Sequence, residues 1–178
     1  MMKILLPAGW NQNRVMLVSA NVLVALLVIA LDHAGVLPLD PVNFVFFSFV
    51  LFLFSLYRPG WAFLFLVGLV PFETVNILPA EWGADLRPYQ WLSAILFFAV
   101  IMRAAAGKLP FPLTRPRWFD WLLLLVPAGA FIAAAYAPDT GAVLKQALIT
   151  LSFGIVYALA RIFWQSVADI RQSIPFIL

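Results

Sequence analysis

The chain has 178 residues, of which 65% are hydrophobic and only 11% are charged, with a formal net charge of +3. Soluble domains are typically about 45–50% apolar and about 25% charged, so this composition argues strongly against a water-soluble fold. The chain has no cysteine and one histidine, His33, which rules out disulfides, thiolate ligands and a histidine-rich metal centre. We therefore expect a membrane protein that needs no metal and no cofactor.

Six apolar stretches approach the length of a transmembrane helix, which needs roughly 20 residues with a range of about 17–25. They cover residues 15–31, 42–57, 61–78, 88–106, 119–136 and 142–164. The apolar runs are continuous, without the alternation of barrel strands, and this favours helices. The sequence thus predicts an all-α, polytopic transmembrane bundle of about six spans over residues 15–164.

The basic residues predict the orientation of these spans. Nine of the eleven Lys and Arg residues lie before the first span, between the second and third, around the connection from the fourth to the fifth, or after the sixth. Only Arg87 and Lys145 lie on the opposite side. Because Lys and Arg are concentrated in cytoplasmic loops, we expect both ends of the chain in the cytoplasm. Residues 1–14 are then a cytoplasmic N-terminus, and the first span is a retained signal anchor because it lacks a clean cleavage site.

The C-terminal segment 165–178 is expected to be cytoplasmic and ends in "IPFIL". These last residues resemble the opening of a seventh span, which would make the chain a fragment that lacks a C-terminal half or a partner membrane protein. The alternative is a short amphipathic tail on the membrane surface.

Glu73 and Asn76 are the first candidate site residues, in the stretch "VPFETVN". If the third span is helical throughout, their spacing of three puts them on one helix face, and Pro71 would free a backbone carbonyl nearby. Ionisable residues inside a membrane are functional candidates, so the pair could form a polar pocket. The alternative is that Glu73 is solvated at headgroup depth or pairs with Arg87.

Arg87 is the second candidate, at the start of the fourth span in "ADLRPYQWL". Pro88 suits the first turn of a helix, and the helix N-terminus adds partial positive charge to that of the guanidinium. Arginine can bind phosphate oxygens through two parallel hydrogen bonds, so we predict contact with a lipid phosphate. The alternative is an interfacial anchor paired with Asp85.

Other features point to lipids and not to nucleic acid. The loop "PLTRPRW" (112–118) is basic and rich in proline, and such a segment beside a membrane is expected to meet anionic lipids. The sequence contains no phosphate-binding glycine loop, aspartate-rich metal motif or nucleophile elbow. Membrane lipids are therefore the expected partners.

Three stretches together resemble the family of O-antigen ligase and polymerase-like membrane proteins. They are "YRPGWAFLFLVGLVPFETVNILP" (57–79), "LRPYQWLSAILFFAVIMR" (86–103) and the segment from "RWFDWLLLLVPAG" to "VYALAR" (117–161). The pattern is similar to the N-terminal half of such proteins and covers about residues 40–173. It implies location in the bacterial inner membrane as a multi-pass protein.

The resemblance also implies a function in cell-surface polysaccharide or lipopolysaccharide biosynthesis. Members transfer a glycan from a polyprenyl pyrophosphate carrier to an acceptor, using Arg and His residues of a large periplasmic loop in the C-terminal half. This chain lacks such a loop, so we assign it no catalytic residue and carry over only Arg87, as a contact to the carrier phosphate. A transporter fragment and a small membrane scaffold or assembly protein are the alternatives.

Overall fold

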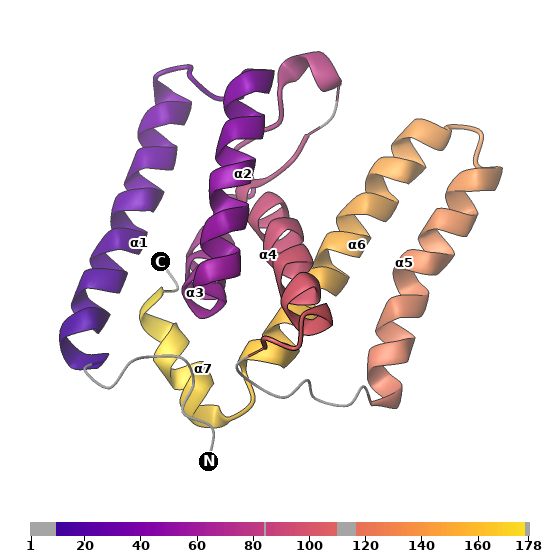
Figure 1. Cartoon of the computed structure of the whole chain (residues 1–178). Helices are drawn as coiled ribbons and strands as arrows, with labels where there is room; N and C mark the ends of the chain where they lie inside the picture. The colour runs from indigo at the N-terminus through magenta and orange to yellow at the C-terminus, as the bar shows by residue number, and fades with distance from the viewer. Residues whose placement is uncertain (1–9, 84, 110–116, 177–178) are drawn as a thin grey trace. The chain divides into compact units, whose positions relative to one another are not determined.

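The computed structural model describes residues 10–83, 85–109 and 117–176, and the regular structure in these ranges is entirely helical. The helices are α1 (Trp10–His33), α2 (Pro41–Tyr57), α3 (Pro59–Leu69), η1 (Ala80–Trp82), α4 (Pro88–Ala105), α5 (Trp118–Tyr136), α6 (Thr140–Phe163), α7 (Val167–Ser173) and η2 (Ile174–Phe176) (Figure 1). The chain divides into two compact units, residues 1–111 with 163–178, and residues 112–162. The predicted all-α class is confirmed for the described residues, which exclude most of the expected N-terminal segment 1–14 and of the basic loop 112–118.

Four helices of the described part are long and apolar enough to cross a membrane. They are Val15–His33 within α1, Pro88–Ala105, Trp118–Tyr136 and Thr140–Phe163. Helices α2 and α3 are also apolar but have only 17 and 11 residues. These helices indicate a membrane protein, whereas the number of six spans and the cytoplasmic position of both ends stay predictions.

The expected helical span over residues 61–78 is wrong beyond Leu69, where α3 ends. Pro71 has no backbone N–H and its ring obstructs the preceding turn, so the helical hydrogen-bond ladder stops there. Residues 70–79 are not helical, although Val70, Phe72 and Val75 among them are apolar. Glu73 and Asn76 therefore do not share a helix face, contrary to the prediction from their spacing.

Helix α2 begins at a well-formed N-terminal cap. The carboxylate of Asp40 accepts hydrogen bonds from the backbone N–H groups of Val42 and Asn43, both at 3.0 Å, and Pro41 occupies the first turn. These two bonds satisfy N–H groups that have no partner inside the helix. They also hold the pKa of Asp40 below its usual value, with the bond from the Asn43 backbone as the largest cause.

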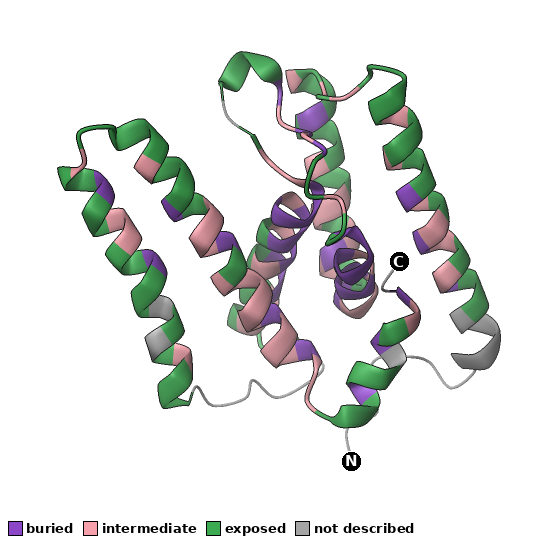
Figure 2. Cartoon of the chain, turned by 180° about the vertical axis from the view of Figure 1, so that it is seen from behind, coloured by how far each residue is buried: buried purple, intermediate pink, exposed green. Residues whose placement is uncertain are grey.

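The first unit is built around α3, which is the most buried helix (Figure 2). Helices α1, α2, α4 and the turn η2 all pack against it. Helix α4 turns one apolar side inward, and the fully buried residues on it follow helical spacing: Leu92, Leu96, Ala99 and Val100. Because α3 is surrounded by other helices and is short, it behaves as a core element of this unit.

Arg103 near the end of α4 ties this helix to α2. Its guanidinium donates hydrogen bonds to the carbonyl of Leu56, which lies in the last turn of α2, and to the carbonyl of Lys108 at 3.0 Å. The guanidinium thereby satisfies carbonyl groups beyond the helical ladder, which is a favourable role for a cation at helix C-termini.

Helices α1 and α3 approach each other closely at one buried polar residue. Asn21 is buried, and its side-chain amide donates a hydrogen bond of 3.3 Å to the backbone carbonyl of Phe176 in η2. A Cβ atom placed on Gly68 would lie 1.9 Å from Nδ2 of Asn21. Glycine at position 68 is therefore what allows α3 to approach the asparagine so closely.

Residues 163–176, which belong to the first unit, pack against α3. Phe163 stacks on Phe63 of α3 with ring centroids 4.6 Å apart, and Trp164 donates a hydrogen bond of 2.7 Å to the hydroxyl of Ser173. Phe176 is 1% exposed. The start of a seventh span in the last residues of the chain stays a prediction.

The second unit contains two helices, α5 and most of α6, joined at one end by a short turn. Asp120 in the first turn of α5 accepts a hydrogen bond from the hydroxyl of Tyr157 at 2.7 Å and forms an ion pair with Arg161 at 3.2 Å. Both partners lie near the end of α6, so the two helices run antiparallel. A shared polar contact at the open end of a helical hairpin fixes its register.

We predict that Gly68→Ala lowers the free energy of unfolding by about 1–3 kcal/mol, the usual cost of overpacking, because the new methyl group meets the Asn21 amide. Thermal unfolding in detergent micelles measures this. The matched control is Gly154→Ala in α6, where a Cβ atom meets nothing within 4 Å. If the two variants are equally stable, Asn21 of α1 does not lie as close to Gly68 of α3 as described here.

We predict that the carboxyl of Asp40 titrates below 3.8, its usual pKa. Its pKa is lowered in the folded state, so the stability from this cap is fully present above the unfolded value and is lost as the pH falls through the folded one. Titration of the Asp40 carboxyl carbon by NMR measures the pKa directly. Unfolding of Asp40→Asn, which keeps an oxygen acceptor without a charge, should lack this part of the pH dependence.

Candidate functional site

The candidate site is the connection between α3 and α4, of which residues 70–83 and 85–87 are described, together with the cavity that Ile77 of this connection lines. Two segments of the connection lie side by side, because the N–H of Ile77 donates to the carbonyl of Leu86 at 3.0 Å. The carbonyl of Ile77 in turn accepts from the N–H of Leu39 at 3.4 Å. The connection is thus held against the segment that precedes α2.

Asn76 organises this connection through both atoms of its amide. Oδ1 accepts hydrogen bonds from the N–H groups of Leu86 at 2.9 Å and Leu78 at 3.2 Å, and Nδ2 lies 3.4 Å from a carboxylate oxygen of Asp85. The two amides that it satisfies have no helix or sheet around them. Asn76 therefore replaces the missing secondary structure, a role that its sequence spacing from Glu73 did not indicate.

Arg87 lies at the junction of the connection with α4, as expected. One guanidinium nitrogen, Nη1, donates to the carbonyl of Thr74 at 3.2 Å, and the backbone N–H donates to the side chain of Gln90 at 3.0 Å. The guanidinium has five N–H donors, and the Thr74 carbonyl uses one of them. Within the part of the chain that the structure describes, this bond fixes the head of a partly exposed cation and occupies one of its donors.

Glu73 is exposed on the same connection, and it lies next to the residue that binds Arg87, Thr74. Residues 70–87 contain three acids, Glu73, Glu81 and Asp85, against the single base Arg87. Their summed field repels a diffusing anion. An anion is therefore held here only if it contacts the guanidinium directly or if another part of the same molecule binds nearby.

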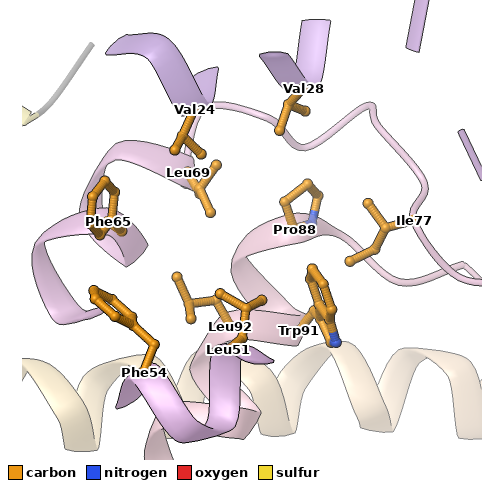
Figure 3. A pocket seen from close by; sticks show the side chains of 10 residues that line it. All are labelled: Val24, Val28, Leu51, Phe54, Phe65, Leu69, Ile77, Pro88, Trp91 and Leu92. Atoms are coloured by element: carbon orange, nitrogen blue, oxygen red, sulfur yellow. The ribbon is translucent and has the colours of Figure 1, made fainter. Parts of the chain in front are cut away.

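An apolar cavity of about 220 Å³ lies beside this connection within the first unit (Figure 3). Its walls come from α1, α2, α3, α4 and the connection, and they include Val24, Val28, Leu51, Leu69, Ile77 and Leu92. Pro88 and Trp91 complete the side formed by α4. Neither Glu73 nor Asn76 lines this cavity, so the polar pocket that we predicted on those residues is a different feature and stays a prediction.

Trp91 presents only its hydrocarbon surface to the cavity. Its indole N–H donates a hydrogen bond of 2.8 Å to the hydroxyl of Ser48 on α2, which satisfies the polar atom away from the cavity. Its ring also stacks on Phe44, with centroids 5.5 Å apart, and Trp82 meets the same phenyl ring edge-on at 5.4 Å. The spacing of the tryptophans in the sequence does not indicate that Trp91 walls a cavity.

In the described residues, no group of three or more His, Asp or Glu side chains could hold a metal ion. The chemistry available around residues 70–92 is therefore that of one guanidinium, three carboxylates and an apolar cavity. This combination suits binding of an amphipathic molecule.

No protein-family model, no curated protein and no solved structure matches the chain. The resemblance to ligase and polymerase-like proteins thus rests on the sequence features given above.

We predict that Asn76→Ala speeds hydrogen exchange of the Leu78 and Leu86 amides, because both lose their acceptor. Each lost bond costs about 1–3 kcal/mol where the donor stays buried, so exchange should rise at least several-fold. Hydrogen–deuterium exchange with mass spectrometry measures it. Glu73→Gln, on an exposed residue of the same connection, is the control and should leave both amides protected.

Proposed function

We propose that this chain is the N-terminal membrane portion of a cell-surface polysaccharide ligase or polymerase-like glycosyltransferase that uses a polyprenyl-pyrophosphate-linked glycan. Within it, residues 70–92 bind the lipid carrier, and Arg87 contacts its phosphate. The bacterial inner membrane is the corresponding location. The observation that carries the proposal is the position of Arg87, whose guanidinium is held by Thr74 and whose neighbour Pro88 walls an apolar cavity.

The chemistry of the carrier explains why these two features belong together. A polyprenyl phosphate has a charged head and a hydrocarbon chain, and it moves within the bilayer. Arginine binds phosphate through paired hydrogen bonds, while an apolar wall next to it receives hydrocarbon. The partial positive charge of the α4 N-terminus adds to that of the guanidinium.

The acidic residues of the connection support a lipid ligand over a free anion. Glu73, Glu81 and Asp85 oppose attraction of soluble phosphates from the aqueous phase. A lipid phosphate arrives along the membrane, with its chain already in hydrocarbon, so it does not depend on long-range attraction. The local negative charge therefore disfavours phosphates that arrive from water and leaves the approach of a lipid phosphate along the membrane.

The short helix α3 raises the transporter alternative, because discontinuous helices often surround transport sites. Such sites bind polar solutes through helix ends and exposed carbonyl groups. Next to the end of α3, however, the cavity is lined by hydrocarbon, including Leu69 itself. The lining fits a lipid chain better than a polar solute, and we therefore retain the glycan-carrier proposal.

We predict that Arg87→Ala weakens binding of polyprenyl phosphate about 10- to 100-fold, which corresponds to losing a charged hydrogen-bonding partner. Native mass spectrometry of the detergent-solubilised full chain gives the bound fraction. Glu73→Gln, which removes a nearby negative charge, should strengthen binding. In cells, Arg87→Ala should abolish glycan transfer at normal protein levels.

The matched control is Lys145→Ala, which removes the other base on the predicted outer side. It should leave lipid binding unchanged. The proposal is wrong for Arg87 if Arg87→Ala and Lys145→Ala bind polyprenyl phosphate equally well, and wrong for glycan transfer if Arg87→Ala cells make normal surface polysaccharide.

A further inference from the structure

We infer that the cavity walled by α1, α2, α3, α4 and Ile77 holds a segment of one hydrocarbon chain of a phosphate-headed lipid. For the phosphate this rests on the function proposed for Arg87, whereas the chain-binding site rests on the cavity alone. The inference assigns a place in the fold to the chain of the ligand, which the sequence did not provide.

The lining of the cavity selects hydrocarbon. Its walls are aliphatic and aromatic, and the one polar side-chain group among them, the Trp91 indole N–H, is bound to Ser48 at 2.8 Å. Figure 3 shows the side chains of α1 and α4 on opposite sides of the same space. A hydroxyl, sugar or phosphate placed inside would lose its hydrogen bonds to water without gaining others, which is costly.

The size of the cavity limits how much of a ligand it takes. At about 220 Å³ it exceeds the roughly 150 Å³ of an engineered apolar cavity that binds benzene. It is smaller than the roughly 300–1,000 Å³ of sites that enclose a whole drug-sized ligand. A short stretch of one chain therefore fits, and the remainder of the lipid stays in the bilayer.

The cavity has a buried wall and a more open side. Leu69, Ile77 and Leu92 are buried, whereas Val24 and Val28 on α1 are partly exposed. The more open side of the cavity therefore lies at α1, where a chain from the surrounding lipid would approach it. Inside a bilayer the hydrophobic effect does not drive this step, because lipid tails are themselves apolar. The gain comes from dispersion contacts that an empty cavity forgoes.

The position of Arg87 decides which lipid head accompanies the chain. Pro88 lines the cavity, and consecutive Cα atoms are about 3.8 Å apart, so the backbone of Arg87 lies at the cavity wall. A phosphate joined to a chain in the cavity can reach this guanidinium. An isoprenoid carrier and a diacyl phospholipid both carry such a phosphate and chain, and the experiment must separate them.

The test uses the full chain in lipid nanodiscs with three photoactivatable probes that carry a diazirine in the hydrocarbon chain. The probes are a polyprenyl phosphate, the matching polyprenol without phosphate, and a diacyl phospholipid. Peptide mass spectrometry then locates the labelled residues. We expect the polyprenyl phosphate to label the cavity residues Leu69 and Leu92, and Val24→Phe to reduce this labelling by about five-fold or more, because the phenyl ring fills the space.

The matched control is Leu23→Phe, which adds the same group one residue away on an exposed position of α1. It should leave labelling of the cavity residues unchanged. Val24→Ala, which enlarges the cavity, should keep or increase it. Because this second variant adds no volume, it tests the site even if Val24→Phe unfolds the bundle.

The three probes separate the two claims. Stronger labelling by either phosphate-bearing probe than by the polyprenol supports the full inference, and the better of those two identifies the lipid class. Equal labelling by all three, still reduced by Val24→Phe, keeps the chain site and overturns the phosphate contact of Arg87. Labelling confined to exposed residues such as Leu23, unaffected by Val24→Phe, overturns the cavity site.

Discussion

The backbone of residues 70–79, 85 and 86 has to find hydrogen-bond partners outside a helix, and the arrangement of the first unit depends on how it does so. In a membrane protein an unsatisfied N–H or C=O group is costly wherever water is excluded. Once Pro71 ends the helical ladder after α3, the side chain of Asn76 supplies acceptors to Leu78 and Leu86, and Thr74 supplies a carbonyl to Arg87. Ile77 pairs with Leu86 and Leu39. The amide of Asn76, the guanidinium of Arg87 and two backbone hydrogen bonds thus take the place of helical hydrogen bonds here.

This solution also explains why the cavity exists. If residues 70–78 had continued α3, Ile77 would lie about 12 Å from Leu69 in the direction of the helix axis, at a rise of about 1.5 Å per residue. Because the chain leaves the helix and returns, Ile77 and Leu69 both line the same space, opposite Val24 and Val28 of α1. The path of the chain that these hydrogen bonds hold therefore leaves an apolar cavity between Ile77, Leu69 and α1. Both features follow from the end of α3 at Pro71.

The sequence predicts the helices well where local signals are strong. Pro41 and Pro88 open α2 and α4 close to the predicted starts, and Gly107, with a positive φ of 66°, follows the end of α4 as expected of a glycine beyond a helix C-terminus. The prediction of a helical span over residues 61–78 was wrong beyond Leu69 because it rested on hydropathy. Val70, Phe72, Val75 and Ile77 are apolar whether or not they are helical. Pro71 was visible in the sequence, but a proline within an apolar run can kink a membrane helix or end it. Only the partners available to the released backbone decide between these outcomes.

In the candidate site, too, the sequence indicates the features that depend on neighbouring residues and misses those that join distant segments. Arg87 could be named from the sequence because a cation before a proline at a helix start is a local pattern. The contact of its guanidinium with Thr74 joins residues 13 positions apart, and the cavity joins segments from Val24 to Leu92, so neither follows from spacing. The close approach of Asn21 to Gly68 is equally non-local, since each residue alone is unremarkable in a membrane helix. Polar side chains and glycine become informative in such a sequence only when the fold shows which helix each of them faces.

The opposing charges around Arg87 give the site a selectivity that the guanidinium alone would lack. An isolated arginine at a membrane surface attracts every anion in reach, including the headgroups of common lipids. With Glu73, Glu81 and Asp85 on the same connection, the attraction at long range is cancelled or reversed, while a direct contact at hydrogen-bond distance is still favourable. In the function that we propose, a lipid phosphate stays at Arg87 because the cavity also holds part of its hydrocarbon chain. The acids would then reject anions that lack such a chain, and the cavity would retain those that have one.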